Sequence, residues 1–367
     1  MANQSSPTMA NHTLFDTALP SLPEYSLTPM ADILKWMPDT WLSVIAPVVV
    51  YWVMSLIFHL IDIYDLFPQY RLHTPEEITR RNHVSRYEVL RDVIIQHIIQ
   101  IATGALLTYT EPVEMTGKAD YDVAVWATRL RVAQRVIPGL LGVFGLNATA
   151  LSKSLADSWP MLAGALSGGY YPYLVSETES PAFAAWELAA AKLIYHVIVP
   201  ALQYLGAVTI LDTWQYFLHR FMHMNKWMYT TFHSRHHRLY VPYAYGALYN
   251  HPFEGFLLDT LGASIAFKAM GMTIRQGMCF FSFSSLKTVD DHCGYEFPWD
   301  PLQLITNNNA AYHDIHHQTW GIKTNFSQPF FTFWDGLLGT KYEGKKGGKL
   351  ANGKATNASG NIEGKAK

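Results

Sequence analysis

The sequence predicts an all-α integral membrane protein, in which a helical membrane bundle carries a cytosolic histidine-rich helical cap that holds a di-metal site. Two observations predict this fold class. Only 15% of the 367 residues are charged, against roughly a quarter in ordinary soluble domains, and apolar runs long enough to cross a membrane alternate with polar segments. Histidines also gather in three short clusters outside those runs. The formal net charge of −2 gives no indication of nucleic-acid binding.

The N-terminal part is expected to hold a polar segment, residues 1–40, and two membrane helices within residues 41–110 that are joined by a basic cytosolic loop. The first helix is predicted by the uninterrupted apolar run Trp41–Leu60. The second is predicted over Val93–Thr108, which includes His97 and two glutamines. These polar groups are expected to face other helices rather than lipid.

The middle of the chain, residues 111–180, is expected to be a lumenal or interfacial insert. Within it, Tyr121–Val136 interleaves apolar residues with arginines, which is typical of a helix that lies in the membrane interface. The apolar stretch Pro181–Ile210 is a third spanning candidate, and Pro200 is expected to kink it.

Residues 181–342 are expected to form a histidine-rich domain, and residues 343–367, which are mostly Gly, Lys, Asn and Ala, a disordered tail. Two apolar segments of this domain, Glu254–Met270 and Met272–Leu286, are broken by a glycine and favour a helical hairpin. The hairpin and the stretch Pro181–Ile210 both end beside histidine clusters. Together they are expected to form an apolar slot that leads to the histidines.

The three histidine clusters have helical spacing. The first is a pair four residues apart, and the motif His-x-x-His-His then occurs twice. Residues three and four apart lie on one face of a helix, so each cluster is expected to present its imidazoles together. The eight candidate metal ligands are His219, His223, His233, His236, His237, His313, His316 and His317.

Eight imidazoles exceed the four ligands of a closed structural zinc site and suit two metal ions. Imidazole binds iron, copper, nickel and zinc, so ligand type alone does not choose the metal. The two cysteines, Cys279 and Cys293, are too few for a cysteine-based zinc or iron–sulfur site. Candidates for orienting the imidazoles through the other ring nitrogen are the carboxylates of Asp212, Glu254, Asp291 and Asp314.

One metal centre requires all three clusters on the same side of the membrane. Of the three predicted spans, the second and the third lie between the loop Asp65–Asp92 and the histidines. Two crossings return the chain to the same side, so this loop is expected on the histidine side. It holds five arginines. The forty residues before the first span hold only Lys35 as a basic residue. Because basic loops tend to stay in the cytosol, the histidine side is expected to be cytosolic.

The order His-x-x-x-His, His-x-x-His-His, His-x-x-His-His between membrane segments resembles the fatty acid hydroxylase superfamily of integral-membrane, histidine-rich di-iron enzymes. The resemblance covers residues 182–342, and the segments DTWQYFLHRFMHMNKWMY, HSRHHRLYVPYAYGALYNHPFEG, LKTVDDHCGYEFPWDP and NNAAYHDIHHQTWGIKTNFSQPFF are similar to the fungal sphinganine C-4 hydroxylases. It implies that residues 181–342 form the catalytic domain and that the eight histidines bind two iron ions (Fe2+/Fe3+). His251 and His292 also match family positions, which implies further ligands or groups that hold the ligands.

The resemblance implies a monooxygenase that uses O2 to hydroxylate a long-chain sphingoid base or dihydroceramide, taken from the bilayer, at carbon 4. It also implies a multi-pass protein of the endoplasmic reticulum membrane with its metal site facing the cytosol. The chain has no Gly-x-Gly-x-x-Gly fingerprint of a nicotinamide- or flavin-binding fold. Electrons from NAD(P)H are therefore expected through an external carrier, by family analogy cytochrome b5 and its reductase.

Two other functions remain open on the sequence. A sterol desaturase or sterol methyl oxidase of the same superfamily would use the same ligand set. A histidine-rich membrane metal transporter would need polar groups along the spans, where His97 and His196 are the histidines that lie deep in the apolar runs.

Overall fold

The computed structural model describes residues 19–171 and 182–344 of the chain. They fall into two compact units, which we describe separately. The insert unit comprises residues 1–31 and 112–205, and the histidine unit comprises residues 32–111 and 206–367. Most of the predicted tail and the first part of the polar N-terminal segment lie outside the described residues, and the five-part division remains a prediction.

Among the described residues, three helices are long and apolar enough to cross a membrane. They are α1 (Asp39–Ile63), α3 (Arg86–Tyr109) and the helix Ala185–Met224, which includes α8 (Ala185–Leu193) and α9 (Val199–Met224). The first two contain the apolar runs that predict them, and the third contains residues 185–210 of the run Pro181–Ile210. The all-α membrane fold predicted from the sequence is therefore confirmed.

Local sequence explains where these helices begin. The Ser85 hydroxyl accepts a hydrogen bond from the backbone N–H of Glu88 (3.1 Å), and this cap starts α3 seven residues before the predicted apolar run. In the loop between α1 and α3, the side chain of Thr74 caps the short helix α2 (Pro75–Arg81). Close to Pro200, where the sequence predicts a kink, a π-helical segment covers residues 194–198, because proline has no N–H for the helical ladder.

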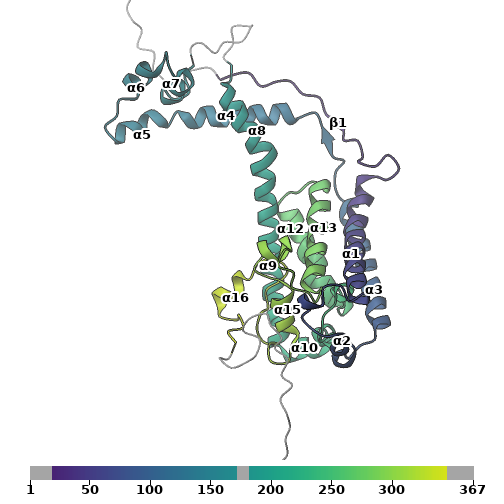
Figure 1. The fold of residues 1–367 in the computed structure, drawn as a ribbon. Coiled ribbons are helices and arrows are strands. Elements are labelled where there is room, and N and C mark those ends of the chain that lie inside the picture. The colour runs from purple at the N-terminus through teal and green to yellow at the C-terminus, as the bar shows by residue number, and fades with distance from the viewer. Residues whose placement is uncertain (1–18, 172–181, 345–367) are drawn as a thin grey trace, which may run out of the picture. The chain divides into compact units, whose positions relative to one another are not determined.

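The insert unit pairs two short strands and packs its helices in two layers (Figure 1). Val123 and Ala127 of one helix pack against Ala191 of another. The interfacial helix expected from the sequence is present as a helix, with bounds Ala119–Gln134. The elements of this unit, besides α8, are the antiparallel strands β1 (Thr28–Pro29) and β2 (Met115–Thr116) and the helices α4 (Ala119–Gln134), α5 (Ile137–Val143), α6 (Ala148–Leu155) and α7 (Pro160–Leu166).

A fourth span is possible in the insert unit. Residues 119–143 and 148–155 pass the test of length and apolar composition as a pair, with a bend of 112° between them. The count of spans predicted from the sequence holds only if this bent pair does not cross the membrane.

A closed polar network is buried between α4 and α8 of the insert unit. The guanidinium of Arg131 donates from Nε and Nη2 to the two carboxylate oxygens of Glu187, at 2.6 and 2.5 Å. Gln134 donates to the same carboxylate at 2.6 Å, and the backbone N–H of Ala184 donates at 2.8 Å. The side chain of Glu187 is fully buried, and its charge is neutralised within the unit.

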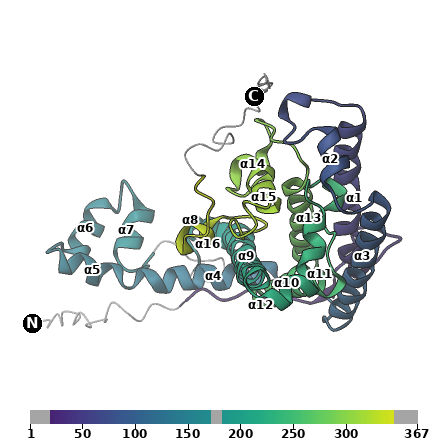
Figure 2. The same cartoon turned by 90° about the horizontal axis from the view of Figure 1, so that it is seen from below.

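In the histidine unit, α13 lies along α1, as Figure 2 shows. The predicted hairpin is present: a helical stretch from Pro252 to Ala269 turns at Gly271, which has a φ of +57°, a conformation that suits glycine. α13 returns and extends five residues beyond the predicted end, to Asp291. The remaining helices are α10 (Lys226–Thr231), α11 (Pro252–Gly255), α12 (Gly262–Ala269), α13 (Ile274–Asp291), α14 (Pro301–Ile305), α15 (Ala310–His317) and α16 (Phe333–Leu338).

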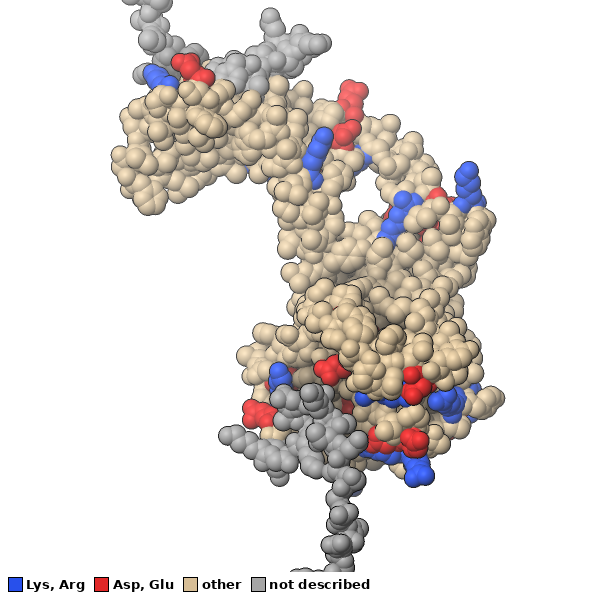
Figure 3. Space-filling view, in the orientation of Figure 1, with Lys and Arg blue, Asp and Glu red and all other residues tan. Residues whose placement is uncertain are grey.

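On the face of the histidine unit that Figure 3 shows, charged side chains lie at two ends, with an uncharged stretch between them. Large apolar side chains of α1 are about half exposed, among them Val49, Val53 and Leu56. An apolar surface of this extent marks a contact with lipid or protein, and with spans of this length we take it as the lipid-facing surface.

Candidate metal centre

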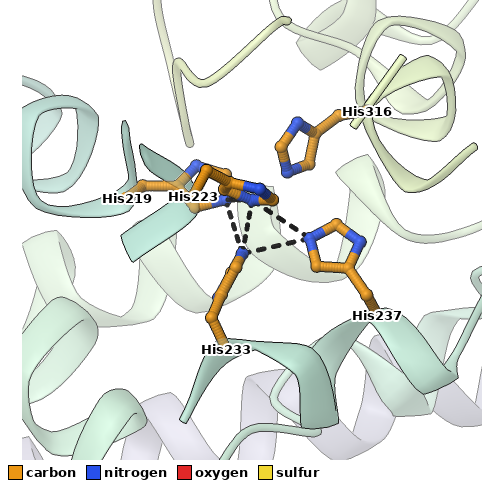
Figure 4. Close-up of side chains that lie close together, drawn as sticks. All are labelled: His219, His223, His233, His237 and His316. Carbon is orange, nitrogen blue, oxygen red and sulfur yellow. Dashed lines mark hydrogen bonds between the residues drawn. The ribbon is translucent and has the colours of Figure 1, made fainter. Parts of the chain in front are cut away.

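The structure brings nine histidines together in two buried groups. Within each group, one ring nitrogen of every residue lies within 4.8 Å of those of all the others. The first group, shown in Figure 4, is His219, His223, His233, His237 and His316. The second group is His236, His292, His313 and His317.

Each His-x-x-His-His motif divides its side chains between the two groups. In the first motif the outer pair, His233 and His237, enters the first group, whereas His236 enters the second. In the motif on α15 the outer pair enters the second group, whereas His316 enters the first. The expectation that each cluster presents its imidazoles together is therefore wrong for the two His-x-x-His-His motifs, whereas His219 and His223 stay together in the first group. On α15, with 3.6 residues per turn, the residue at i+3 points about 100° away from the one at i+4, so one short helix can serve two sites. Residues 233–238 form a 3-10 helix and divide their histidines in the same way.

The imidazoles of the first group meet through their Nε2 atoms. His233 Nε2 lies 2.6 Å from His223 Nε2, 3.1 Å from His219 Nε2 and 3.0 Å from His237 Nε2. Figure 4 shows the His316 ring facing the same space, and its Nε2 is buried without a hydrogen-bond partner among the described residues.

The second group has the same geometry. His313 Nε2 lies 3.1 Å from His292 Nε2 and 3.1 Å from His317 Nε2. The ring of His236 lies 4.6 Å from that of His317, measured between centroids. The two groups adjoin each other, because neighbouring residues of both motifs belong to different groups.

Backbone carbonyl groups fix the tautomer of five of these histidines. A carbonyl oxygen can only accept a hydrogen bond, so a neutral imidazole that contacts one through Nδ1 carries its proton there and leaves Nε2 as a bare lone pair. The pairs are His219 Nδ1 with Phe326 O (2.8 Å), His316 Nδ1 with Thr324 O (2.7 Å), His236 Nδ1 with Tyr249 O (3.1 Å), His292 Nδ1 with Thr288 O (2.9 Å) and His317 Nδ1 with Leu239 O (2.9 Å).

A carboxylate does the same for His233. Glu254 contacts its Nδ1, and both residues are buried. The other three carboxylates that the sequence proposes for this role do not contact the nine histidines in this way. Asp212 accepts the backbone N–H groups of Phe330 and Phe331, Asp291 pairs with Lys287, and Asp314 pairs with His73.

Burial keeps these imidazoles neutral. It lowers the pKa of His236 to about 4 and those of His233 and His292 to about 3, because a charged ring loses its hydration inside the protein. The neutral imidazole is the form that binds a metal. Both groups are therefore ready to bind metal at neutral pH.

The donor set fits two metal ions. Bare lone pairs about 3 Å apart repel one another, and a cation between them removes the repulsion. With metal–nitrogen bonds of about 2.0–2.1 Å, adjacent donors around one ion are spaced by roughly the same 3 Å. Five donors in one group and four in the other match two ions better than a single ion.

Three of the histidines that lie outside both groups are ones that the sequence singles out. His251, which the sequence offers as a ligand, instead caps α11, where its Nδ1 accepts the backbone N–H of Phe253 at 3.2 Å. His97 lies in α3 and contacts Gln100 Oε1 through Nδ1, at 3.1 Å. His196 lies in the helix of the third span with its side chain exposed. We leave all three out of the site.

Sequence reasoning misses the carbonyl acceptors and the loop that supplies two of them. The loop after α15 carries Thr324 and Phe326, and the carboxylate of Asp212 anchors it by accepting two backbone N–H groups. No residue type marks a carbonyl acceptor, because every residue has one. His292 is not missed, because the sequence resemblance points to it as a ligand or as a group that holds a ligand.

Two adjoining cavities open beside the second histidine group. The larger is mainly apolar and lies between α1, α3, α9 and the hairpin, with Val44, Leu211, Phe267 and Phe281 in its walls. The smaller is polar and is lined by residues that include His233, His236, His292, His313 and Glu254. Both are lined by Gln215, Asp259, Thr288 and Pro329, so they meet at these four residues.

The larger cavity corrects the slot expected from the sequence. The hairpin forms one wall, as expected. The opposite walls come from α1 and α3 and from Leu211 and Gln215 of α9, and the described part of Pro181–Ile210 supplies no lining residue. The apolar cavity thus lies between other helices and meets the polar cavity that the histidines line.

Comparison with known proteins agrees with this site. The fatty acid hydroxylase family matches residues 204–340, which contain all nine histidines. The sphingolipid C4-hydroxylase of Saccharomyces cerevisiae is 44% identical over 322 residues, 88% of this chain and 77% of that protein. The sphingolipid C4-hydroxylase of Schizosaccharomyces pombe is 41% identical over 320 residues, 86% of this chain and 92% of that protein.

A sterol enzyme matches a shorter part of the chain. Methylsterol monooxygenase 1 of Rattus norvegicus is 36% identical over 137 residues, 37% of this chain and 45% of that protein. No solved structure matches. Since the family matches the histidine-rich region and the two fungal relatives align with most of the chain, the chain belongs to the fatty acid hydroxylase family, alongside the sphingolipid C4-hydroxylases.

Proposed function

We propose that this protein is a monooxygenase that hydroxylates a long-chain sphingoid base or dihydroceramide at carbon 4, with two iron ions bound by the nine histidines. The observation that carries this proposal is the pair of buried histidine groups beside an apolar cavity. It is supported by relatives named as sphingolipid C4-hydroxylases that align with more than four fifths of the chain.

The iron ions, when bound, supply the reduction of O2 that hydroxylation of an unactivated C–H bond requires. The protein's own part is to hold the site. Carbonyl groups and Glu254 fix the imidazole rings with Nε2 inward, and burial excludes water and keeps the rings neutral. Because six of the nine rings are fixed through Nδ1, the donor atoms are set before metal binds.

Position along the lipid chain determines which carbon reacts. A misplacement of about 1 Å can cost roughly a hundredfold in rate. The apolar cavity suits an alkyl chain, and the polar cavity beside His236 and His292 suits a polar head. Carbon 4 is one bond from the amino-diol head of a sphingoid base, so it would lie where the two cavities meet.

A sterol is the alternative substrate within the family. Two observations favour the sphingoid base. The sterol enzyme aligns with little more than a third of the chain, and the junction of the cavities is lined by hydrogen-bonding groups such as Gln215 and Asp259, to which an apolar sterol ring system offers no hydrogen bond.

The remaining partners follow from the chemistry. Electrons would come from NAD(P)H through cytochrome b5 and its reductase, since the chain has no nicotinamide- or flavin-binding fingerprint. We place the protein in the endoplasmic reticulum membrane with the histidines on the cytosolic side, because the loop between α1 and α3 is rich in arginine. Protease added to sealed microsomes is expected to remove a C-terminal tag, and protection of the tag would reverse this orientation.

The direct test supplies the purified protein with cytochrome b5, its reductase, NADH and O2. Sphinganine or dihydroceramide is expected to give the 4-hydroxy product, detected by mass spectrometry. Sterol turnover without any 4-hydroxy sphingoid product would contradict the substrate and leave a metal-dependent oxygenase. Absence of turnover in a preparation that holds two irons per chain would contradict the reaction itself.

A further inference from the structure

A single carboxylate stands at the junction of the apolar and polar cavities. Asp259 lies in the π-helical segment of residues 256–261, a type of irregularity that often occurs at functional sites. Its side chain lines both cavities. No lysine or arginine is among the described residues that line either cavity, so no cation of the protein balances the carboxylate there.

Two amides hold this carboxylate in place. Gln215 Nε2 donates to Asp259 Oδ1 at 3.1 Å, and Asn250 Nδ2 lies 3.5 Å from Oδ2. A carboxylate has about four acceptor positions, so both oxygens can still accept from a ligand in the cavity. The carboxylate of Glu254 on the polar cavity also has a buried oxygen, Oε2, without a partner among the described residues.

We propose that Asp259, held by Gln215 and Asn250, binds the polar head of the substrate by accepting hydrogen bonds from its 2-amino (or amide) and 3-hydroxyl groups. This inference rests on the proposed function. It makes Asp259 the residue that selects a 2-amino-1,3-diol and sets which carbon faces the metals.

The chemistry of the head group fits this position. The amine and the 3-hydroxyl are hydrogen-bond donors attached to carbons 2 and 3, directly beside carbon 4. With these donors on Asp259 at the junction, the chain beyond carbon 4 extends into the apolar cavity. A free fatty acid, as a carboxylate, has no hydrogen-bond donor to offer Asp259. A sterol would leave Asp259 with only the donors of Gln215 and Asn250 and would not use its remaining acceptor positions.

The experiment measures substrate discrimination with the iron-loaded, full-length protein. The substrates are sphinganine, its analogue without the 3-hydroxyl and its analogue without both the 3-hydroxyl and the 2-amino group. Wild type is expected to prefer sphinganine over the last analogue by roughly 10- to 100-fold in kcat/KM, the range for loss of a hydrogen bond to a charged group. In Asp259→Asn, kcat/KM for sphinganine should fall by a similar factor and the preference should shrink towards equality.

Iron content, measured on the same samples, should stay at two per chain in Asp259→Asn. The matched control is Asp120→Asn, which removes an exposed carboxylate outside both cavities and should keep the wild-type preference. An unchanged preference in iron-loaded Asp259→Asn would overturn the inference.

If Asp259→Asn does not fold, the substrate preference of the wild-type protein still tests the inference. Equal turnover of sphinganine and the analogue without both donors would then overturn the inference. Failure of the proposed function is a separate result, since wild type would turn over no sphingoid substrate at all.

Discussion

Both units of this protein bury polar side chains, but they do so in opposite ways. In the insert unit the Arg131 guanidinium, the Gln134 amide and a backbone N–H all donate to the carboxylate of Glu187, so donors and acceptors match. In the histidine unit nine imidazoles turn nitrogen atoms towards one another, and for most of them those nitrogens are acceptors. Native proteins satisfy nearly all buried polar groups. A matched network therefore indicates structure, whereas acceptors that face acceptors indicate a cation-binding site.

The largest effect is expected from removing a histidine whose Nε2 faces the first group. His316→Ala should bring hydroxylation below detection and lower the iron content, because one ion loses a ligand that its redox chemistry needs. Mass spectrometry of the product and metal analysis of the purified protein measure both. His196→Ala, which removes an exposed imidazole outside both groups, is the control. Normal turnover in His316→Ala would refute the assignment of the first group.

Breaking the matched network should affect stability and leave chemistry intact. Glu187→Ala leaves the buried charge of Arg131 without its partner, and loss of one member of a buried ion pair costs about 3–5 kcal/mol. Thermal unfolding in detergent should show a lower Tm, with unchanged iron content in the folded fraction.

The double variant Arg131→Met, Glu187→Leu is the matched control for that stability effect. It removes both charges, and such replacements are often close to neutral, so most of the lost Tm should return. If Glu187→Ala instead removed iron while Tm stayed constant, the contrast between the two units would be wrong.

The smallest effect is expected from the group that orients His233. Glu254→Gln keeps the shape of the side chain but weakens its hold on His233 Nδ1, and loss of such a partner typically costs about 10- to 100-fold in metal affinity or activity. Iron titration of the apoprotein measures the affinity. Asp314→Asn, which changes a carboxylate that pairs with His73 and not with one of the nine histidines, should leave iron affinity near wild type. Equal loss in both variants would show that Glu254 has no special role.

Sequence by itself determined the helices and most of the candidate ligands. Apolar runs predicted α1, α3 and the helix that ends with His219 and His223, because burial in lipid depends on composition and length alone. The caps at Thr74 and Ser85 follow from side chains that bond within one turn. Spacing and resemblance pointed to every histidine of the two groups, including His292, because both are properties of short segments.

Tertiary structure alone decided how those histidines are shared between two groups and what holds them. His236 and His316 each lie in a different group from the other two histidines of their own motif, and His251 lies in neither group. The carbonyl oxygen that orients His219 lies 107 residues away in the sequence, and the one that orients His317 lies 78 residues away. The cavity junction at Asp259 likewise depends on α9 and the hairpin meeting. Spacing fixes which side chains share a helix face, but the group that a face meets depends on long-range packing, which no local pattern records.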